Sequence, residues 1–358
     1  MNSSIGIKPV FDKNAVAIMM AADDNYAPYC GVMIQSIKEN SNQSRNYDIV
    51  IAGTRISQNN KELLESMQEK NISIRVIDIN GYLKDMDLSV FVIGGYLSVE
   101  TYYRLFIPKI FAGYNKVIYL DIDMVVLRDT AELYDTNIGD NWWGATHDKG
   151  VLVSPYLYKR ARSLSYLTDT LRMKSYFDYF QAGVMVWNIQ QCIKDNVFGK
   201  CIDRLKEIGT PKHVDQCAMN SVANGKHIFW LSSYWDVLGY VSVQRMKCDR
   251  NMRLHKIASH LLKNPFILHF SGALKPWDWQ NMPYANKFWQ YAQNTPFYEV
   301  ILRRLADKHI SKSQKIDRIR RKAIKYTMGR ILTLGLIKSF RVREADYREQ
   351  LEQLQIWR

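Results

Sequence analysis

The sequence of 358 residues predicts an α/β fold, with a mixed sheet flanked by helices and a basic helical tail. Three observations support this prediction. Apolar runs typical of buried strands alternate with segments of helical spacing, as in sheets whose parallel strands are joined by helices. Hydrophobic residues make up 47% of the chain, which provides a large core and excludes a disordered or fibrous protein. Positive charge is concentrated in one C-terminal segment.

The first half of the chain alternates between strand and helix patterns. The run AVAIMMAA at residues 15–22 is continuously apolar, as in a strand buried on both faces, and polar residues typical of a turn end it. The elements that we then expect are a helix at 28–39, a strand at 47–53, a polar helix at 61–70 and a strand at 72–79. This order indicates a parallel sheet.

The second half contains the most apolar strand pattern of the chain, KVIYLDIDMVVL at residues 116–127. The other elements that we expect are a helix at 101–111, a helical excursion or lid at 149–178, a strand at 180–187, a helix at 189–208 and a closing segment at 265–279. We therefore expect one mixed domain over residues 1–285 and a helical basic region over residues 286–358.

The formal net charge is +14, from 49 Lys and Arg against 35 Asp and Glu. Residues 303–343 hold 14 basic and two acidic residues, a net +12, whereas residues 1–302 have a net charge of only +4. Excess positive charge can indicate a nucleic acid, a membrane surface or an acidic substrate. Because the basic residues lie outside the body of the chain and no nucleic-acid motif is present, we expect no nucleic-acid partner; a nucleic-acid-binding protein is the alternative from a different class.

The cysteines and the N-terminus predict the compartment. Five cysteines, an odd number without a C-x-x-C pair, indicate a reducing compartment rather than a disulfide framework or a structural zinc site. The first residues lack the basic-then-apolar pattern of a secretory signal, and no run of about 18 apolar residues occurs. We therefore expect a cytoplasmic protein that does not cross a membrane.

Asp121 and Asp123 stand two residues apart inside the apolar pattern of residues 116–127. In a strand their side chains project from the same face, at the end of the sheet where open α/β folds bind ligands. Two adjacent carboxylates repel one another and are costly among apolar residues unless a cation neutralises them. The pattern therefore favours a divalent-metal site; the alternative is that both side chains cap turns at a strand end.

A second group of polar residues lies in the segment HFSGALKPW at residues 269–277. His269 could ligate a metal, Gly272 would let the backbone approach a phosphate closely, and Lys275 would supply a positive charge. The alternative for His269, which follows apolar residues, is a core histidine with satisfied hydrogen bonds. The combination of the three residues favours a site.

Three segments in this order resemble the retaining glycosyltransferases of family 8: AADDNYAPYC at 21–30, YLDIDMVVL at 119–127 and LHFSGALKPW at 268–277. That family includes bacterial lipopolysaccharide galactosyl- and glucosyltransferases and glycogenin. The resemblance covers residues 15–280. It implies the fold called GT-A, a Rossmann-like mixed sheet with flanking helices that binds a nucleotide-diphospho-sugar.

By matching motif positions, the resemblance implies that Asp121, Asp123 and His269 are metal ligands, with Mn²⁺ or Mg²⁺ as the ion, and that Asp121 also contacts the donor. Two carboxylates and an imidazole suit these ions better than a thiolate-seeking metal. The ion would act as a Lewis acid on the diphosphate, so that the departing UDP needs no separate protonation.

The resemblance also implies donor contacts. Asp23, Asn25 and Tyr26 match positions that approach the uracil and the ribose, and their side chains can read a base edge or stack on it; an ordinary turn is the alternative. Lys275 and the backbone at Gly272 match positions that hold the diphosphate.

Residues for the sugar and the reaction follow in the same way. Arg104 matches an arginine that contacts the donor, with a solvated helix residue as its alternative, and Asp148 matches an acidic position near the donor and acceptor sugars. Asp215 and Gln216 match the positions nearest the reacting carbon. Because a neutral amide is a poor nucleophile, we favour front-side attack over double displacement: the diphosphate takes the acceptor proton and Gln216 stabilises positive charge at the anomeric carbon.

Two positions depart from the family pattern. Gln181 occupies the amide position of the usual F-N-[AS]-G motif and is one methylene longer, and Cys217 replaces an acid that often follows the D-Q pair. Both changes concern sugar recognition rather than metal chemistry. The donor hexose and the acceptor therefore cannot be copied from a relative.

Between residues 316 and 340, apolar residues recur at spacings of three and four among basic residues. A basic helix with one apolar face lies in a membrane interface, where each basic residue near anionic lipid contributes about 1 kcal/mol. We expect residues 303–343 to contact an anionic membrane surface. The alternative is a helix packed on the domain with a solvated basic face.

These features predict a peripheral enzyme on the inner face of a bacterial cytoplasmic membrane. It would transfer a hexose, glucose or galactose, from a UDP-sugar to a surface glycan or glycolipid with retention of configuration. The expected acceptor is the lipopolysaccharide core, in an α-linkage. A glycogenin-like enzyme that glucosylates itself or another protein is the alternative within the family.

Overall fold

The computed structural model describes residues 6–13, 15–84, 86–93, 98–151, 164–239, 260–332, 343–346 and 350. The chain forms two compact units, Met1–Tyr298 and Glu299–Arg358. The first unit contains helix α13 (Ala285–Ala292), which the expected division at residue 285 assigned to the C-terminal region. The first unit therefore extends beyond the last of the three motif segments.

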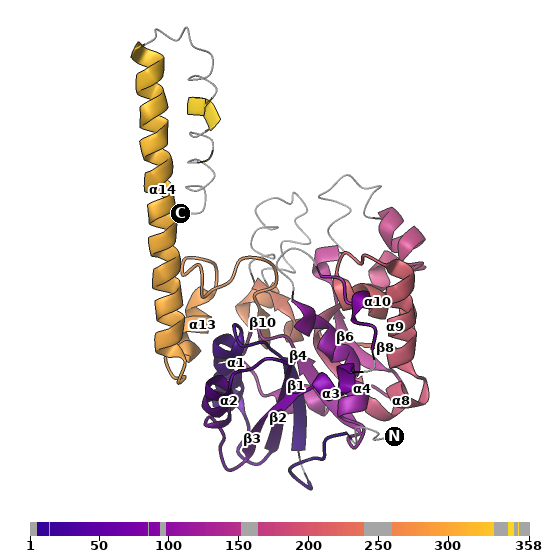
Figure 1. Cartoon of the computed structure of the whole chain (residues 1–358). Helices are drawn as coiled ribbons and strands as arrows, with labels where there is room; N and C mark the ends of the chain where they lie inside the picture. The colour runs from indigo at the N-terminus through magenta and orange to yellow at the C-terminus, as the bar shows by residue number, and fades with distance from the viewer. Residues whose placement is uncertain are drawn as a thin grey trace. The chain divides into compact units, whose positions relative to one another are not determined.

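A seven-stranded mixed sheet is the main element of the first unit (Figure 1). Its strands, in spatial order, are β3 (Ile72–Asp78), β2 (Asn46–Gly53), β1 (Ala15–Ala21), β4 (Lys116–Leu120), β7 (Phe180–Asn188), β6 (Trp143–His147) and β8 (Ile228–Trp230). β1 is parallel to both of its neighbours, whereas β7 is antiparallel to β4 and β6. The α/β class and the mixed sheet are confirmed, and β1, β2, β3 and β7 each lie within one residue of an expected strand.

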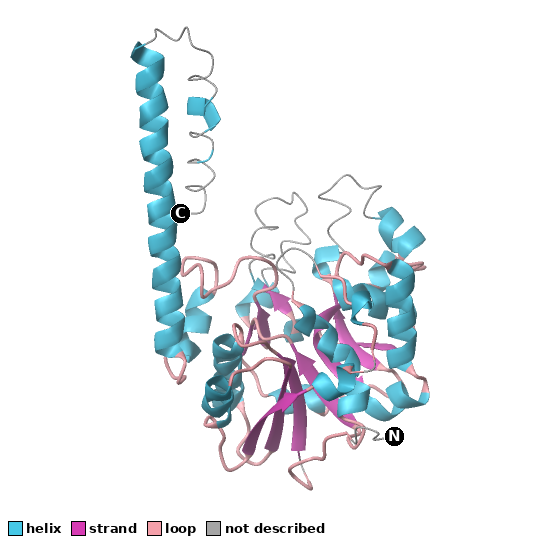
Figure 2. Ribbon diagram, in the orientation of Figure 1, coloured by secondary structure: helices cyan, strands magenta, loops and turns pink. Residues whose placement is uncertain are grey.

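Helices flank this sheet (Figure 2). They are α1 (Ala27–Asn40), α2 (Gln58–Glu65), α3 (Asn80–Leu83), α4 (Ile107–Ile110), α5 (Thr130–Tyr134), α8 (Ile189–Lys194), α9 (Val197–Ile208), α10 (Val214–Ala223) and α13. Short 3₁₀ or π turns, η1 (Leu88–Val90), η2 (Val99–Phe106), η3 (Tyr166–Thr170), η4 (Tyr176–Asp178) and η5 (Ser233–Trp235), connect the larger elements.

Three of the expected helices differ from the structure in their bounds. α2 begins three residues early because the Ser57 hydroxyl accepts a hydrogen bond from the Asn60 N–H (3.3 Å) and so caps the helix. The helix expected at 189–208 is two helices, because Asn196 has a left-handed backbone (φ 47°) and caps α9 with its side chain. The helix expected at 101–111 is the 3₁₀ turn η2 followed by α4. Of the excursion expected at 149–178, residues 152–163 lie outside the described residues.

The single strand expected at 116–127 is wrong. The chain forms β4, leaves the large sheet at Asp121 and enters a second sheet as β5 (Met124–Val126). This second sheet has three strands in the order β5, β10 (Ile267–His269), β9 (Val237–Leu238). The backbone changes partners within three residues: the Asp121 N–H donates to the Gly183 carbonyl (2.8 Å), and the Asp123 carbonyl accepts from the Phe270 N–H (2.8 Å). The two aspartates therefore lie in a link between sheets and not in the middle of a strand.

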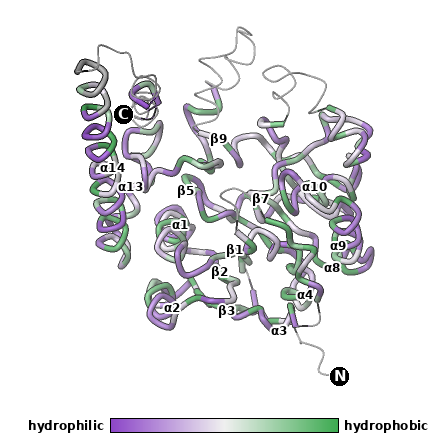
Figure 3. The backbone as a smooth tube through the Cα atoms, turned by 45° about the horizontal axis from the view of Figure 1, so that its top comes forward, coloured by the Kyte–Doolittle hydropathy of each residue, from purple (hydrophilic) through white to green (hydrophobic). Residues whose placement is uncertain are grey.

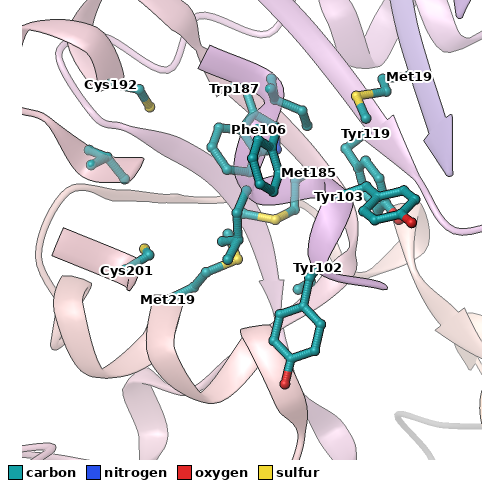
Figure 4. Packing of buried hydrophobic residues seen from close by; sticks show 14 of the residues in the cluster. Met19, Tyr102, Tyr103, Phe106, Tyr119, Met185, Trp187, Cys192, Cys201 and Met219 are labelled. Atoms are coloured by element: carbon teal, nitrogen blue, oxygen red, sulfur yellow. The ribbon is translucent and has the colours of Figure 1, made fainter. Parts of the chain in front are cut away.

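The core that supports this link is rich in aromatic and sulfur-containing side chains. Tyr102 and Phe106 from η2 gather with Met185 and Trp187 from β7 and Met219 from α10 (Figure 4). Each of these side chains is less than 2% exposed. Burial of a large apolar side chain contributes roughly 1.5–3 kcal/mol, so this cluster holds η2 firmly against the sheet. The sequence pattern did not indicate β6, β8 or β9, because strands of two to five residues are too short to show a period.

The second unit consists mainly of α14 (Tyr298–Leu332), along which hydrophilic and hydrophobic residues alternate (Figure 3). Ile316, Ile319 and Ala323 are buried, whereas Ile324 and Met328 are 59% and 57% exposed. Residues 333–340 of the expected amphipathic segment lie outside the described residues. No helix in the described ranges combines the length and the apolar character that crossing a bilayer requires.

A buried ion pair at one edge of the large sheet generates a stability prediction. Asp48 on β2 is fully buried and accepts hydrogen bonds from Arg75 on β3 (2.8 Å) and from the Tyr114 hydroxyl (2.7 Å). Asp48→Asn leaves the Arg75 charge without its partner and should lower the free energy of unfolding by about 3 kcal/mol in urea denaturation. The control is Asp135→Asn in the exposed pair with Arg45, for which about 1 kcal/mol or less is expected. Equal losses for the two variants would contradict this account of the edge.

Candidate active site

The link between the two sheets brings three potential metal ligands together. Asp121 follows β4, Asp123 precedes β5, and His269 ends β10 opposite Met124. One ligand atom from each of Asp121, Asp123 and His269 lies within 4.8 Å of the other two. His269 Nε2 is 3.2 Å from Asp123 Oδ1. Two carboxylates and an imidazole form a donor set that suits Mn²⁺ or Mg²⁺.

Gly183 on β7 leaves room for this cluster. A Cβ atom at this position would lie 2.7 Å from His269 Cε1 and 2.8 Å from Asp121 Oδ2, closer than real Cβ contacts. Any larger residue would therefore displace the ligand side chains. The space beside the three ligands, together with their chemistry, fits a divalent cation.

Positive side chains balance the two aspartates. Lys275 Nζ donates to Asp123 Oδ2 and to the Phe270 carbonyl (3.0 Å), and Lys275 is buried. Burial raises the pKa of Asp123, but Lys275 and His269 outweigh it and hold this pKa well below its usual range. Burial likewise opposes the charged form of His269, yet Asp123 and Asp236 raise its pKa to about 10. The two carboxylates thus favour the protonated form of the His269 ring.

Arg104 joins the metal cluster to the segment expected to lie near the reacting carbon. Its guanidinium is 3.0 Å from Asp121 Oδ1, 2.8 Å from Asp215 Oδ2 and over the ring of Tyr119, and it donates to the Ala182 carbonyl. Arg104 is only 5% exposed, so the alternative of a solvated helix residue is wrong. Burial raises the pKa of Asp215 to about 6 although Arg104 opposes this shift.

A cavity of about 120 Å³ opens beside these charges. Of the residues expected to bind donor or metal, those that line it are Asp23, Tyr26, Arg104, Asp121, Asp123 and Lys275. Asn25 and Gly272 are not among the lining residues: Asn25 is exposed, and a Cβ at Gly272 would meet no atom within 4 Å. The glycine at 272 is required by its backbone, which has a φ of 102°, and not by close packing.

The segment that precedes α1 forms a turn and also faces the cavity. The Tyr26 N–H donates to Asp23 Oδ1 (2.8 Å), so the ordinary turn considered as an alternative is present. Burial, with a further contribution from Asp123, raises the pKa of Tyr26 to about 12, which keeps its hydroxyl protonated. A structural turn and a cavity-lining role are therefore compatible in these residues.

Gln216, Asp148 and Gln181 form a second group, outside the lining of this cavity. The Gln216 amide nitrogen donates to Asp148 Oδ2 (2.9 Å), and its oxygen accepts from the Ala182 N–H (2.9 Å). Gln181 Oε1 accepts from the Gly183 N–H. These contacts hold both glutamine amides in fixed orientations at the beginning of β7. Cys217 is fully buried, with its sulfur 3.3 Å from the Tyr166 hydroxyl.

Two buried carboxylates at the site were not expected from the sequence. Glu100 lines the cavity, and its Oε1 atom has no hydrogen-bond partner in the described part of the chain. Asp236 is 2.9 Å from His269 Nδ1 through its Oδ1 atom. Each is a single acidic residue near aromatic residues, Glu100 in VETYY and Asp236 in SYWDV. The only signal in the sequence is that Glu100 precedes Arg104 by four residues; nothing comparable marks Asp236.

Comparisons with known proteins agree with this geometry. The family model described as glycosyl transferase family 8 matches residues 17–280. General stress protein A of Bacillus subtilis is 27% identical over 78% of this chain and 93% of its own length. Lipopolysaccharide 1,2-glucosyltransferase of Escherichia coli is 23% identical over 85% of each chain.

Among solved structures, the WbbM bifunctional glycosyltransferase superposes with a TM-score of 0.72 at 30% identity. That match covers 84% of this chain and 53% of WbbM, so the chain spans about half of that protein. The family model covers most of the chain and all three motif segments, and the fold is that of GT-A enzymes. The chain therefore belongs to glycosyltransferase family 8.

Proposed function

We propose that the protein is a metal-dependent retaining hexosyltransferase. It would use UDP-glucose or UDP-galactose and form an α-linkage on a bacterial surface glycan, with the lipopolysaccharide core as the acceptor. The observation that supports this most directly is the cluster of Asp121, Asp123 and His269, whose two aspartates line a cavity together with Arg104 and Lys275. Similarity to a lipopolysaccharide glucosyltransferase supports the class of acceptor.

Different residues of the site would bind different parts of the sugar donor. Asp121, Asp123 and His269 would hold Mn²⁺ or Mg²⁺, which stabilises negative charge on the diphosphate when bound. Lys275 would bind a diphosphate oxygen as a buried point charge, next to the backbone at Gly272. The contact of Lys275 with Asp123 supports this, because the same ammonium already lies at the metal cluster.

The nucleoside would lie at the other side of the cavity, against the turn before α1. Asp23 and Asn25 would hydrogen-bond the uracil and the ribose, and Tyr26 would pack its ring on the base. Tyr26 lies edge-on to Trp277, with ring centroids 6.1 Å apart. An aromatic wall of this kind favours a planar base over other groups of the donor.

The environment of Asp215 and Gln216 supports front-side attack. Asp215 is 1% exposed and paired with Arg104, and both polar atoms of the Gln216 amide have partners, so neither offers a free nucleophile. In the proposed step the bond between the anomeric carbon and the diphosphate breaks. The acceptor oxygen forms its bond on the same face and passes its proton to a diphosphate oxygen. Gln216, oriented by Asp148, would stabilise the positive charge at that carbon.

Residues 303–343 would attach the enzyme to the inner face of the cytoplasmic membrane. In the described part of α14, one face is buried and another exposes Ile324 and Met328 beside Arg321 and Lys325. Two apolar side chains next to basic ones suit an anionic lipid surface. A lipid-borne acceptor would be present at that same surface.

The metal site leads to the first functional prediction. Asp123→Asn keeps the shape of the side chain but removes a negative charge that a divalent cation requires, so Mn²⁺-dependent UDP binding and sugar transfer should be lost. Calorimetric titration with UDP and Mn²⁺ measures this loss, and circular dichroism tests whether the fold remains. Asp140→Asn, at an exposed loop residue, is the control and should bind as the wild type does. A fully active Asp123→Asn enzyme would show that the cation site lies elsewhere.

The position of Gln216 leads to a prediction about the kinetic parameters. Gln216→Ala removes a group that acts on charge formed only in the transition state, so kcat should fall by about 10² while the KM for the UDP-sugar stays nearly constant. Steady-state measurement of UDP release gives both values. A rise in KM at unchanged kcat would mean that Gln216 binds the ground state and the transition state equally and would contradict this role.

The tail prediction concerns two exposed basic residues. The double variant Arg321→Ala, Lys325→Ala removes two charges worth about 1 kcal/mol each near anionic lipid, which corresponds to a roughly thirtyfold weaker partition into anionic vesicles. Vesicle co-sedimentation measures it, and hydrolysis of the UDP-sugar in solution should be unaffected. Lys70→Ala with Lys174→Ala, two exposed lysines of the first unit, is the matched control. If both double variants bind vesicles equally, α14 is not the attachment site.

A further inference from the structure

Three side chains from the small sheet and from the residues directly before its strands form one contact group. Asp123 directly precedes β5, His269 ends β10, and Asp236 directly precedes β9. β10 is antiparallel to β5, with His269 opposite Met124, and parallel to β9, with His269 opposite Leu238. By these registers Asp236 is level with Ile267, two residues before His269, so its side chain reaches His269 diagonally across one face of the small sheet.

The His269 ring lies between two carboxylates. Its Nε2 atom is 3.2 Å from Asp123 Oδ1, and its Nδ1 atom is 2.9 Å from Asp236 Oδ1. The side chains of His269 and Asp236 are 2% and 1% exposed, so water does not compete for this contact. Because an ionised carboxylate can only accept, the hydrogen bond to Asp236 requires a proton on Nδ1. Nε2 is then the nitrogen that faces the metal cluster.

The second oxygen of Asp236, Oδ2, is buried and has no hydrogen-bond partner among the residues that the structure describes. A buried carboxylate oxygen left without a partner carries a desolvation cost. Within the described ranges, hydrogen bonding therefore uses only one oxygen of the Asp236 side chain. Its close contact with His269 is the interaction that its charge serves.

The segment that contains Asp236 is held from the other side of the site. Lys149 Nζ donates to the carbonyl oxygens of Ser233 (3.3 Å) and Asp236 (3.2 Å). Lys149 follows Asp148, whose side chain contacts Gln216. The backbone at Asp236 is thus fixed by the loop after β6, and its carboxylate is presented to His269 at a set position.

We propose that Asp236 is a positioning residue for the metal site: it fixes the tautomer and ring orientation of His269 and makes Nε2 a stronger ligand for a divalent cation. A carboxylate on the non-coordinating nitrogen of a histidine ligand commonly has this effect, and its loss weakens metal binding by roughly 10–100-fold. This inference rests on the metal site of the proposed function but not on the identity of the sugar or acceptor.

The test measures Mn²⁺ affinity in the full-length chain by the electron paramagnetic resonance signal of free Mn²⁺, with and without UDP. Asp236→Ala should bind Mn²⁺ about 10–100-fold more weakly than the wild type. Asp236→Asn, which keeps an acceptor oxygen but not the charge, should lose less. The matched control is Asp195→Asn, because Asp195 also accepts a hydrogen bond from a ring N–H, that of Trp142 (2.5 Å), away from the site. Its Mn²⁺ affinity should not change.

Two further readouts separate positioning from a structural role. The metal-free thermal midpoint of Asp236→Asn should stay close to that of the wild type, because the amide oxygen still accepts from Nδ1, whereas Asp236→Ala leaves that buried nitrogen without a partner and should lower the midpoint. Nitrogen-15 NMR of the His269 ring should show the Nδ1 proton of the wild type lost or exchanging between the two nitrogens in Asp236→Ala.

Three outcomes would overturn the proposal. The first is an Asp236→Ala variant that binds Mn²⁺ as tightly as the wild type. The second is a loss of Mn²⁺ affinity that accompanies a lower thermal midpoint and also occurs in Asp195→Asn. The third is a wild-type chain that binds no Mn²⁺, either with or without UDP. The proposed function can fail separately. If the wild type binds Mn²⁺ but transfers no sugar, and Asp236→Ala binds Mn²⁺ more weakly than the wild type, the role of Asp236 is supported and only the proposed function is refuted.

Discussion

Two carboxylates in a three-residue link between sheets are the constraint on which the site depends. Two carboxylates this close repel one another unless positive charge lies beside them. Arg104 lies against Asp121, whereas Lys275 and His269 lie against Asp123. The link itself has little freedom, because its first residue pairs with β7 and its last with β10. Each of these positive side chains therefore lies where it offsets the negative charge of one aspartate.

The beginning of β7 connects the metal cluster to the residues assigned to the reaction. The carbonyl of Ala182 accepts from Arg104, and its N–H donates to Gln216. The next residue, Gly183, leaves the space in which His269 and Asp121 approach one another. A shift of this short segment would displace ligand, guanidinium and amide together. Metal binding and sugar orientation are thus mechanically coupled, and a substitution at Gly183 would damage both.

The sequence predicted what local patterns determine and missed what distant partners determine. Continuous apolar runs located β1 to β3 and β7, and the spacing of two aspartates located a cation site. The break at Asp121 could not be predicted, because it arises from hydrogen bonds to Gly183 and Phe270, far along the chain. Asp236 was missed for the same reason: only the pairing of β9 with β10 brings it to His269. A single acidic residue before a two-residue strand has no local signature.

The tail shows how a periodic pattern can contain two faces. The residues counted as one apolar stripe divide in α14: Ile316, Ile319 and Ala323 are buried, whereas Ile324 and Met328 are exposed. Successive members of each set are three or four residues apart, so spacing alone cannot separate them. The exposed set is small and lies beside basic residues. Attachment through it would depend more on charge than on inserted apolar area, and salt should weaken it strongly because a charged surface contact is screened within about 8 Å at physiological ionic strength.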